Sequence, residues 1–200
     1  MATHGNTRDS QQLGTGDFAL EPGSKSVAAP RSLVLLNTGD GKGKSTAALG
    51  VVMRAVAQGW PVCVIQFLKS GSWNAGEEFI CRRLGVDWLN GGDGFVRKPA
   101  GRERSRACAL DAWSRAGVAL SSGEHRLVVL DELTYPVSFG WIQAEEVAET
   151  IAARHPYVNV VIAGRQAPQA LIDVADTVTD MVNVRHPFEQ GIVAQAGIDF

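Results

Sequence analysis

A glycine- and lysine-rich segment, residues 38–45, has the spacing of a phosphate-binding loop. It stands between an apolar run and a helical pattern, so its backbone N–H groups and the positive end of the helix dipole converge on one spot. Lys44 adds a positive charge there, and the Ser45 hydroxyl is placed to ligate magnesium. The residues that we expect to bind the nucleotide are Thr38, Gly39, Asp40, Gly41, Lys42, Gly43, Lys44, Ser45 and Thr46. We therefore predict that the chain binds a nucleoside triphosphate, ATP with magnesium.

The loop departs from the usual G-x-x-x-x-G-K-[ST] pattern at its first position, where Thr38 replaces glycine. Gly39 and Gly41 supply the flexibility instead. The alternative is a glycine–lysine turn of no function, which the strand and helix on either side disfavour. Lys42 is either a solvated surface charge or a second cation for a highly charged ligand.

A pair of carboxylates, Asp131 and Glu132, follows the apolar run 127–130. A carboxylate at the end of a strand near such a loop holds magnesium directly or through water. The predicted metal ligands are thus Ser45, Asp131 and Glu132. The alternative is an acidic pair that caps the next helix.

Short apolar runs alternate with helical patterns along the chain, and these elements must position the loop and the carboxylates. The predicted strands are residues 33–36, 62–67, 86–89, 127–130, 158–162 and 177–184, and the predicted helices are 46–58, 77–84, 102–120, 143–154 and 168–174. This alternation predicts an α/β fold with a mainly parallel β-sheet flanked by helices. The apolar stripes expected to face the core are Leu49, Val52, Met53 and Val56 in helix 46–58, and Ala107, Leu110, Trp113 and Val118 in helix 102–120.

Composition narrows the class of protein. Residues 1–30 are rich in Gly, Ser, Thr and Pro and read as a flexible arm, whereas residues 31–200 fit a single domain. The formal charge of -2 gives no reason to expect nucleic acid or a membrane surface as a partner. No apolar run approaches the length of a membrane span, and the N-terminus lacks a secretory pattern, so we expect a cytoplasmic protein. The three separated cysteines indicate neither a zinc site nor a disulfide framework.

The segment 38–46 resembles the TGxGKGK[ST]T loop of the ATP:corrinoid adenosyltransferases. The likeness extends over residues 32–200 in the order of that family. It includes Gln66-Phe67-Leu68-Lys69, Trp73, Gly76-Glu77, residues 129–135, Gly164-Arg165, residues 175–178, residues 185–188, Gly191, Ala194-Gln195 and residues 197–200.

The resemblance implies a RecA-like P-loop fold and transfer of the 5′-deoxyadenosyl group of ATP to the cobalt(I) of a reduced corrinoid. The acceptor would be cob(I)alamin or cob(I)yrinic acid a,c-diamide, and triphosphate would be released. It also implies a homodimer, ATP bound in reverse of the usual P-loop direction, and an electron-donor flavoprotein as a further partner. Lys44, Phe95 and Glu132 would be catalytic. Since cobalt(I) is itself the nucleophile, no activated side chain is needed, and the sequence shows no evident triad.

In the family that this chain resembles, the corrinoid-binding loop has the pattern G-F-T-W, and its two aromatic side chains pack beneath the corrin. This chain has Phe95 but carries Arg97 in place of the tryptophan. Three interpretations of Arg97 are open. It would pair with an acidic side chain of the corrinoid, its presence would indicate a differently substituted acceptor, or the loss of the tryptophan would weaken activity. His186 is either a cobalt ligand or a hydrogen-bonded structural residue.

Further residues lie near the expected site, each with a structural alternative. Arg54 and Arg165 would bind the nucleotide, or they form surface ion pairs. Gln66 and Lys69 follow a strand's carboxyl end, where ligands bind in such sheets. Trp73 and Glu77 share that neighbourhood, although packing and a helix start explain them almost as well.

Two other functions remain open from the residues alone. One is a P-loop phosphotransferase or ATPase that acts on another small molecule and releases ADP. The other is a non-catalytic protein that binds ATP and corrinoid without turnover.

Overall fold

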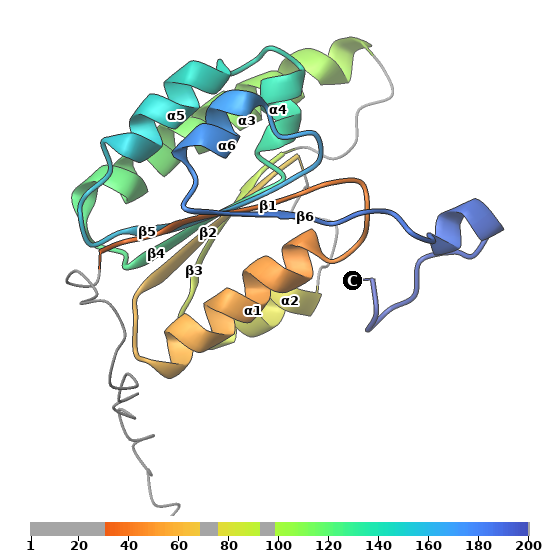
Figure 1. Cartoon of the computed structure of the whole chain (residues 1–200), viewed down its shortest axis with the longest axis horizontal. Helices are drawn as coiled ribbons and strands as arrows, with labels where there is room; N and C mark the ends of the chain where they lie inside the picture. The colour runs from red at the N-terminus through yellow and green to blue at the C-terminus, as the bar shows by residue number, and fades with distance from the viewer. Residues whose placement is uncertain (1–30, 69–75, 93–98, 200) are drawn as a thin grey trace, which may run out of the picture. The chain divides into compact units, whose positions relative to one another are not determined.

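The computed structural model describes residues 31–68, 76–92 and 99–199, which all belong to the second of the chain's two units, Met1–Pro30 and Arg31–Phe200. Strands and helices alternate along this unit, as Figure 1 shows. The strands are β1 (Val34–Thr38), β2 (Val62–Phe67), β3 (Asp87–Gly91), β4 (Leu127–Asp131), β5 (Asn159–Ala163) and β6 (Thr177–Asp180). The helices are α1 (Lys44–Ala57), α2 (Gly76–Arg83), α3 (Pro99–Ser122), α4 (Thr134–Ser138), α5 (Ala144–Ala152), α6 (Gln169–Val174) and the 3₁₀ helix η1 (Pro187–Gln190).

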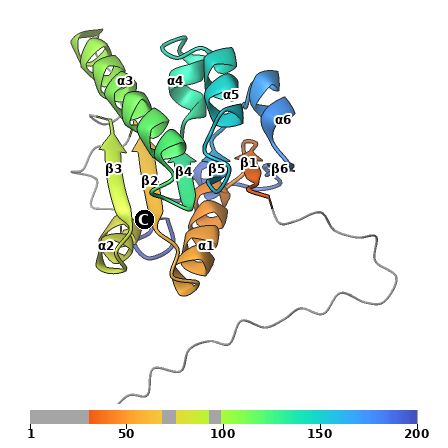
Figure 2. The ribbon, with the colours of Figure 1, turned by 90° about the vertical axis from the view of Figure 1, so that its left-hand side faces the viewer.

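The six strands form one sheet in the order β3-β2-β4-β5-β1-β6, and every neighbouring pair is parallel. Parallel strands need crossover connections, which place helices on the faces of the sheet. Figures 1 and 2 show α1 and α2 on one face and α3, α4, α5 and α6 on the other. The predicted α/β fold with a mainly parallel, helix-flanked sheet is confirmed.

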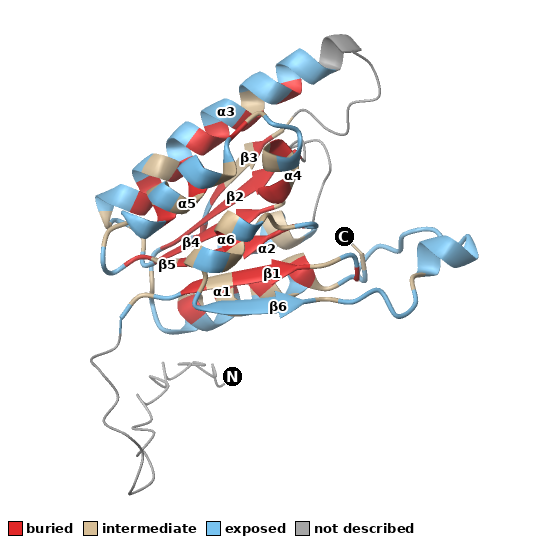
Figure 3. Cartoon of the chain, turned by 45° about the horizontal axis from the view of Figure 1, so that its top comes forward, coloured by how far each residue is buried: buried red, intermediate tan, exposed pale blue. Residues whose placement is uncertain are grey.

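The core consists of one apolar layer on each face of the sheet. The layer under α1 and α2 joins Val52 to the alternate strand residues Val64 and Val129, and the layer under α3 and α5 joins Leu120 to Val128. Because β2 and β4 are covered on both faces, they are buried along their whole length (Figure 3). This explains why the central strands read as continuous apolar runs in the sequence.

The predicted core stripes of two helices are partly wrong. Helix α1 buries Ala48, Val52 and Ala55, whereas Met53 is 39% exposed. On α3, Leu110 and Val118 are 37% and 63% exposed. The helix faces the sheet instead with a row of small residues, namely Ser105, Ala109, Ala112, Ala116 and Ala119. Small side chains let a helix backbone approach the strands closely, and a Cβ added at Gly91 of β3 would lie 2.4 Å from the Ala112 Cβ.

The final strand is shorter than predicted, because β6 ends at Asp180 rather than near residue 184. The chain then leaves the sheet to follow the phosphate loop, and the Met181 N–H donates to the Thr38 carbonyl at 2.9 Å. The short helix α4 was not predicted, and its Pro136 occupies the first turn, where proline is tolerated. Among the described residues, no helix has both the length and the apolar character needed to cross a membrane.

Candidate active site

The predicted phosphate loop connects β1 to α1 at the carboxyl edge of the sheet. Gly43 precedes α1 with a φ of 116°, a conformation that favours glycine. Lys44 is the first helical residue, and its side chain bends back over the loop. Its ammonium donates to the carbonyl oxygens of Gly39 and Gly41 at 2.7 and 2.5 Å. The lysine thus lies at the helix N-terminus, where its charge adds to the dipole that attracts phosphate.

Lys44 is only 8% exposed, and this burial lowers the pKa of its ammonium. The positive charge of Arg165 lowers the pKa further, while Glu132, Asp40 and Asp131 act in the opposite direction. A buried cation with two carbonyl acceptors is only partly compensated in the free protein. A bound polyanion would favour the charged form of this lysine.

The loop's first residues are fixed by the chain that follows β5 and β6. The Thr38 hydroxyl accepts a hydrogen bond from the Ala167 N–H at 3.1 Å, which gives threonine a role at the position where the usual pattern has glycine. The Gly41 N–H donates to the Met181 carbonyl at 2.6 Å. A Cβ at Gly39 would lie 2.2 Å from the Asp180 carboxylate. A Cβ at Gly41 would lie 2.6 Å from the Met181 carbonyl oxygen. These two glycines therefore allow the close approach of a second backbone.

The loop and the acidic strand end meet at Ser45 and Asp131. The Ser45 hydroxyl donates to one Asp131 carboxylate oxygen at 2.8 Å, and the Gln66 side-chain amide donates to the other at 2.9 Å. Asp131 is 4% exposed. Strand β5 separates β4, which carries Asp131, from β1, which leads into the loop.

The oxygen donors at this point suit magnesium. A hydroxyl and a carboxylate in direct contact lie close enough to share one ion, and Mg²⁺ is held by one or two carboxylates together with phosphates and water. Glu132 follows in a left-handed conformation with φ of 60°, and it lines the pocket described next. Among the described residues there is no group of three or more His, Cys, Asp or Glu side chains that would hold a metal without such help.

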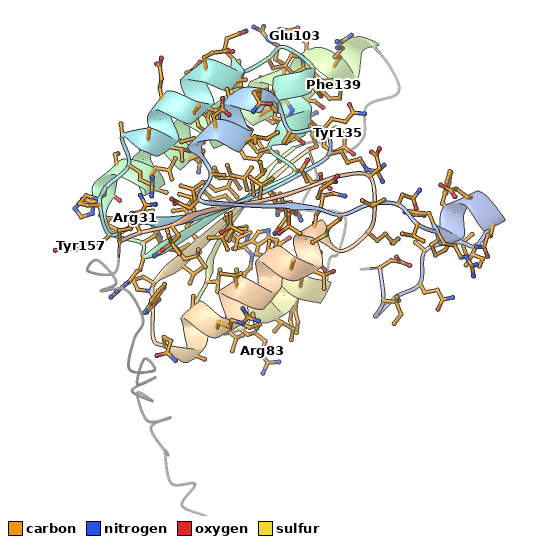
Figure 4. All side chains as sticks on the ribbon, in the orientation of Figure 1. Arg31, Arg83, Glu103, Tyr135, Phe139 and Tyr157 are labelled. Atoms are coloured by element: carbon orange, nitrogen blue, oxygen red, sulfur yellow. The ribbon has the colours of Figure 1, made fainter. Side chains whose placement is uncertain are left out.

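A cavity of about 940 Å³ opens over the loop. Its residues come from the loop and α1, from α2, from the strand ends and from the C-terminal segment. They are Gly41, Lys42, Gly43, Lys44, Ser45, Thr46, Leu49, Gly50, Met53, Gly76, Glu77, Ile80, Cys81, Glu132, Tyr135, Arg165, His186, Gly197, Ile198 and Asp199. Figure 4 shows Tyr135 at the end of the sheet where the loop lies. The cavity combines a cationic, N–H-rich floor with an apolar wall, as a nucleotide site requires.

The C-terminal segment closes one side of this cavity. The Asp199 carboxylate pairs with the Lys42 ammonium, and this hydrogen bond lowers the pKa of Asp199. His186 lines the cavity and accepts a hydrogen bond from the Phe188 N–H at 3.2 Å through Nδ1. That contact agrees with the alternative in which His186 is a hydrogen-bonded structural residue. A neighbouring hollow of about 370 Å³ is lined by Asp40, Lys42, Arg165, Asn183, His186, Pro187, Phe188, Glu189, Ile192, Ala194 and Asp199.

The structure brings together most of the predicted site residues, but not all. Arg165 lines both cavities and contacts Asp40 at 3.4 Å, an exposed ion pair. Arg54 is exposed and is not one of the described residues that line either cavity, so its nucleotide contact stays a prediction. Four residues named from the sequence lie outside the described residues, namely Lys69, Trp73, Phe95 and Arg97.

Sequence reasoning missed the apolar part of the cavity. It assigned Leu49 and Met53 to the core and left out Ile80, and it named Tyr135 and Ile198 only as part of the family resemblance and not as site residues. A signal was available in α1, because apolar residues occupy two faces of that helix and only one of them can face the sheet.

Comparison with known proteins identifies the family of this chain. Residues 30–200 match the family model described as ATP:corrinoid adenosyltransferase BtuR/CobO/CobP. The chain is 38% identical to the corrinoid adenosyltransferase CobA of Salmonella typhimurium over 170 residues, which cover 85% of this chain and 86% of that protein. It is 41% identical to a corrinoid adenosyltransferase of Pseudomonas aeruginosa, covering 85% and 84%, and 37% identical to that of Escherichia coli K12, covering 85% and 86%. A match over the loop, the acidic strand end and the C-terminal segment together means that the chain belongs to the ATP:corrinoid adenosyltransferase family.

Proposed function

We propose that this protein transfers the 5′-deoxyadenosyl group of ATP to the cobalt of a reduced corrinoid and releases triphosphate. The proposal is supported chiefly by the hydrogen bond from Ser45 of the phosphate loop to the Asp131 carboxylate. This contact occurs in a chain that matches the family model over residues 30–200. The acceptor is cob(I)alamin or a precursor such as cob(I)yrinic acid a,c-diamide, and the product serves adenosylcobalamin synthesis or salvage.

The reaction breaks the bond between C5′ and its oxygen, and the whole triphosphate is the leaving group. Cobalt(I) supplies the electron pair of the new cobalt–carbon bond, and the pair of the broken bond leaves on the triphosphate oxygen. The protein must therefore stabilise negative charge that grows on the phosphate chain. The loop N–H groups, Lys44 and Lys42 are placed to do so, because all of them border one cavity.

Magnesium completes the set of groups around the triphosphate. Ser45 and Asp131 would hold it, with Glu132 beside them, and it would supply a positive charge that stabilises the leaving group. Gln66 keeps the Asp131 carboxylate oriented by its own hydrogen bond, so the carboxylate is fixed before the ion arrives.

The corrinoid-binding part of the proposal rests on Phe95 and Arg97, which lie outside the described residues. Phe95 would pack below the corrin and exclude the lower axial ligand, which makes the cobalt easier to reduce. Arg97 occupies the position at which the G-F-T-W loop of the family has tryptophan. Activity of the Arg97→Trp variant with several corrinoids tests whether this arginine selects the acceptor or limits the rate.

The proposal also includes a homodimer in the cytoplasm, an electron-donor flavoprotein that reduces the corrinoid, and residues 1–30 as an arm outside the domain of residues 31–200. Exposed apolar side chains along the C-terminal segment support self-association, in particular Val182, Val184, Phe188, Val193 and Ile198. Among the described residues, strand β6 lies at the edge of the sheet, and an edge strand can pair with a strand of a second copy. Sedimentation of the whole chain measures the dimer.

One assay separates this function from its two rivals. The protein is incubated anaerobically with MgATP and chemically reduced cob(I)alamin, the cobalt–carbon spectrum is followed, and the phosphate product is identified. Adenosyl transfer gives the alkylcobalt spectrum with inorganic triphosphate, whereas a phosphotransferase or ATPase gives ADP. A non-catalytic binder retains both substrates but produces no spectral change.

A further inference from the structure

The C-terminal strap, which we define as residues 182–199, lies outside the apolar core. Figure 1 shows the chain leaving β6, reaching η1 at the far end of the strap and then returning toward the start of α1. Every residue of the strap is exposed except His186 and Asp199, which are partly buried. Neither layer of the core includes a strap residue, so core packing does not hold the strap in place.

Hydrogen bonds within the strap give it a shape of its own. The Asn183 side-chain amide donates to the Glu189 carboxylate at 2.7 Å. The Asp199 carboxylate accepts a hydrogen bond from the Gln195 N–H at 2.9 Å. Among the described residues, the one hydrogen bond or ion pair that joins the strap to the rest of the chain is the pair between Asp199 and Lys42.

Both ends of the strap are fixed on the phosphate loop. Directly before the strap, the Met181 carbonyl accepts a hydrogen bond from the Gly41 N–H at 2.6 Å. At the other end of the strap, Asp199 pairs with Lys42, the next residue of the loop. The strap is therefore an arc that is held at two neighbouring loop residues, and a change at the loop reaches it directly.

The Lys42–Asp199 pair also stands between the two hollows beside the loop. The residues that line both hollows are Lys42, Arg165, His186 and Asp199. Two of these four belong to the strap, and a third is the partner of Asp199. When the pair opens, the wall between the two hollows loses its connection to the loop.

Asp199 occupies a cation that a triphosphate needs. The hydrogen bond from Lys42 lowers the pKa of Asp199, so this carboxylate is charged at neutral pH. The Lys42 side chain is 49% exposed, and water therefore weakens the pair. A lysine ammonium is a compact charge on a flexible stem, which lets it change partners. The several negative charges of a triphosphate attract it more strongly than one carboxylate does.

We propose that the Lys42–Asp199 pair is an autoinhibitory latch, which holds the strap on the phosphate loop until a triphosphate takes Lys42 and releases the strap. This inference rests on triphosphate binding as part of the proposed function, but it needs neither the corrinoid nor adenosyl transfer. The coupling is reciprocal, because the factor by which the latch weakens triphosphate binding equals the factor by which triphosphate weakens the latch. For an exposed ion pair this factor is about two- to fivefold.

Trypsin cleavage measures how often the strap is open. The strap contains one trypsin site, after Arg185. A protease needs a detached segment, so the rate at which the fragment 186–200 forms tracks the open population. The fragment is quantified by mass spectrometry for the whole chain, with and without saturating inorganic tripolyphosphate at constant ionic strength. A peptide substrate corrects for any direct effect of tripolyphosphate on trypsin.

Two variants separate the latch from a general effect of charge. Asp199→Asn removes the charge of the latch and keeps an oxygen for the Gln195 N–H. Asp111→Asn is the matched control, because Asp111 forms an exposed ion pair with Arg115 on α3 and lines neither hollow.

Tripolyphosphate is expected to speed cleavage after Arg185 by about two- to fivefold in the parent protein and in Asp111→Asn. The Asp199→Asn protein should be cleaved at the higher rate without ligand and should not respond further to tripolyphosphate. Slower or unchanged cleavage of the parent protein with tripolyphosphate would overturn the proposal. Equal cleavage of the parent protein and Asp199→Asn without ligand would also overturn it.

These outcomes are distinct from failure of the proposed function. If tripolyphosphate releases the strap but the protein forms no cobalt–carbon bond with ATP and reduced cob(I)alamin, the latch stands and the proposed function is wrong. If adenosyl transfer proceeds while cleavage after Arg185 does not respond to tripolyphosphate, the latch is wrong and the function stands.

Discussion

Replacing Gly41 by alanine is expected to damage both the fold and the phosphate site. The added Cβ would lie 2.6 Å from the Met181 carbonyl oxygen and 2.7 Å from that of Val182, whereas ordinary contacts begin near 3.4 Å. Both neighbours are backbone atoms, so no side chain can rotate to relieve the overlap. Either the loop or the chain after β6 must move, and the hydrogen bond from the Gly41 N–H to Met181 is lost or stretched.

The magnitude follows from these contacts. Overpacking costs about 1–3 kcal/mol and the lost hydrogen bond about 1 kcal/mol, while the stiffer unfolded chain returns about half a kcal/mol. The free energy of unfolding should therefore fall by about 1.5–3.5 kcal/mol, which lowers the Tm by roughly 3–14 °C in a domain of this size. Calorimetry should also show weaker binding of tripolyphosphate, because the loop N–H groups no longer converge.

Gly50→Ala is the matched control for this change. Gly50 is helical and open, so alanine there should stabilise the protein by up to about 1 kcal/mol. If Gly41→Ala unfolds at the temperature of the parent protein and binds tripolyphosphate equally well, the chain after β6 does not hold the loop. The account of the two glycines would then be wrong.

Three further predictions concern charged groups. Asp131→Asn should weaken the magnesium-dependent part of triphosphate binding by about 10–100-fold, measured with and without the metal, and equal losses in both would exclude a metal role. Burial lowers the pKa of Lys44 below the usual lysine value of 10.5, so the affinity for tripolyphosphate should fall as the pH rises toward that lowered pKa. The Lys44→Arg variant keeps its charge over this range and should show no such fall. Identical pH profiles of the parent protein and the variant would contradict this prediction. Asp199→Asn should tighten tripolyphosphate binding about two- to fivefold, because it releases Lys42 from the ion pair. Since Lys42 lowers the pKa of Asp199, the pair should persist at neutral pH and break only as the pH falls through that lowered pKa. Unchanged affinity in the variant would show that the pair does not compete with phosphate.

The parts of the fold that the sequence predicted are those with a strong local signal. The buried strands are continuous apolar runs because both of their faces are covered, and the loop stands out by its glycines and by Lys44 and Ser45. The end of β4 was predictable for the same reason, since Asp131 is a charged residue directly after four apolar ones. Its contact with Ser45 follows from the carboxyl ends of parallel strands meeting at one edge.

The remaining parts depend on tertiary contacts that no local pattern encodes. The stripe that contains Met53 is as apolar as the buried face of α1, and only the position of α2 makes it a cavity wall. On α3, alanines were overlooked because close packing, rather than side-chain size, selects them. The strand ends at Asp180 because Gly41 binds the next residue, a contact across 140 residues.

The most direct test of the central claim is which bond of ATP breaks. Under anaerobic conditions, the protein, magnesium and reduced cob(I)alamin are given the ATP analogue whose β and γ phosphates are bridged by nitrogen. Cleavage at C5′ does not touch that bridge, so the account predicts an alkylcobalt spectrum and one intact imidotriphosphate released per cobalt–carbon bond. The account would be contradicted if the analogue binds as tightly as ATP but only ATP gives a cobalt–carbon bond. Release of ADP from ATP would also contradict it.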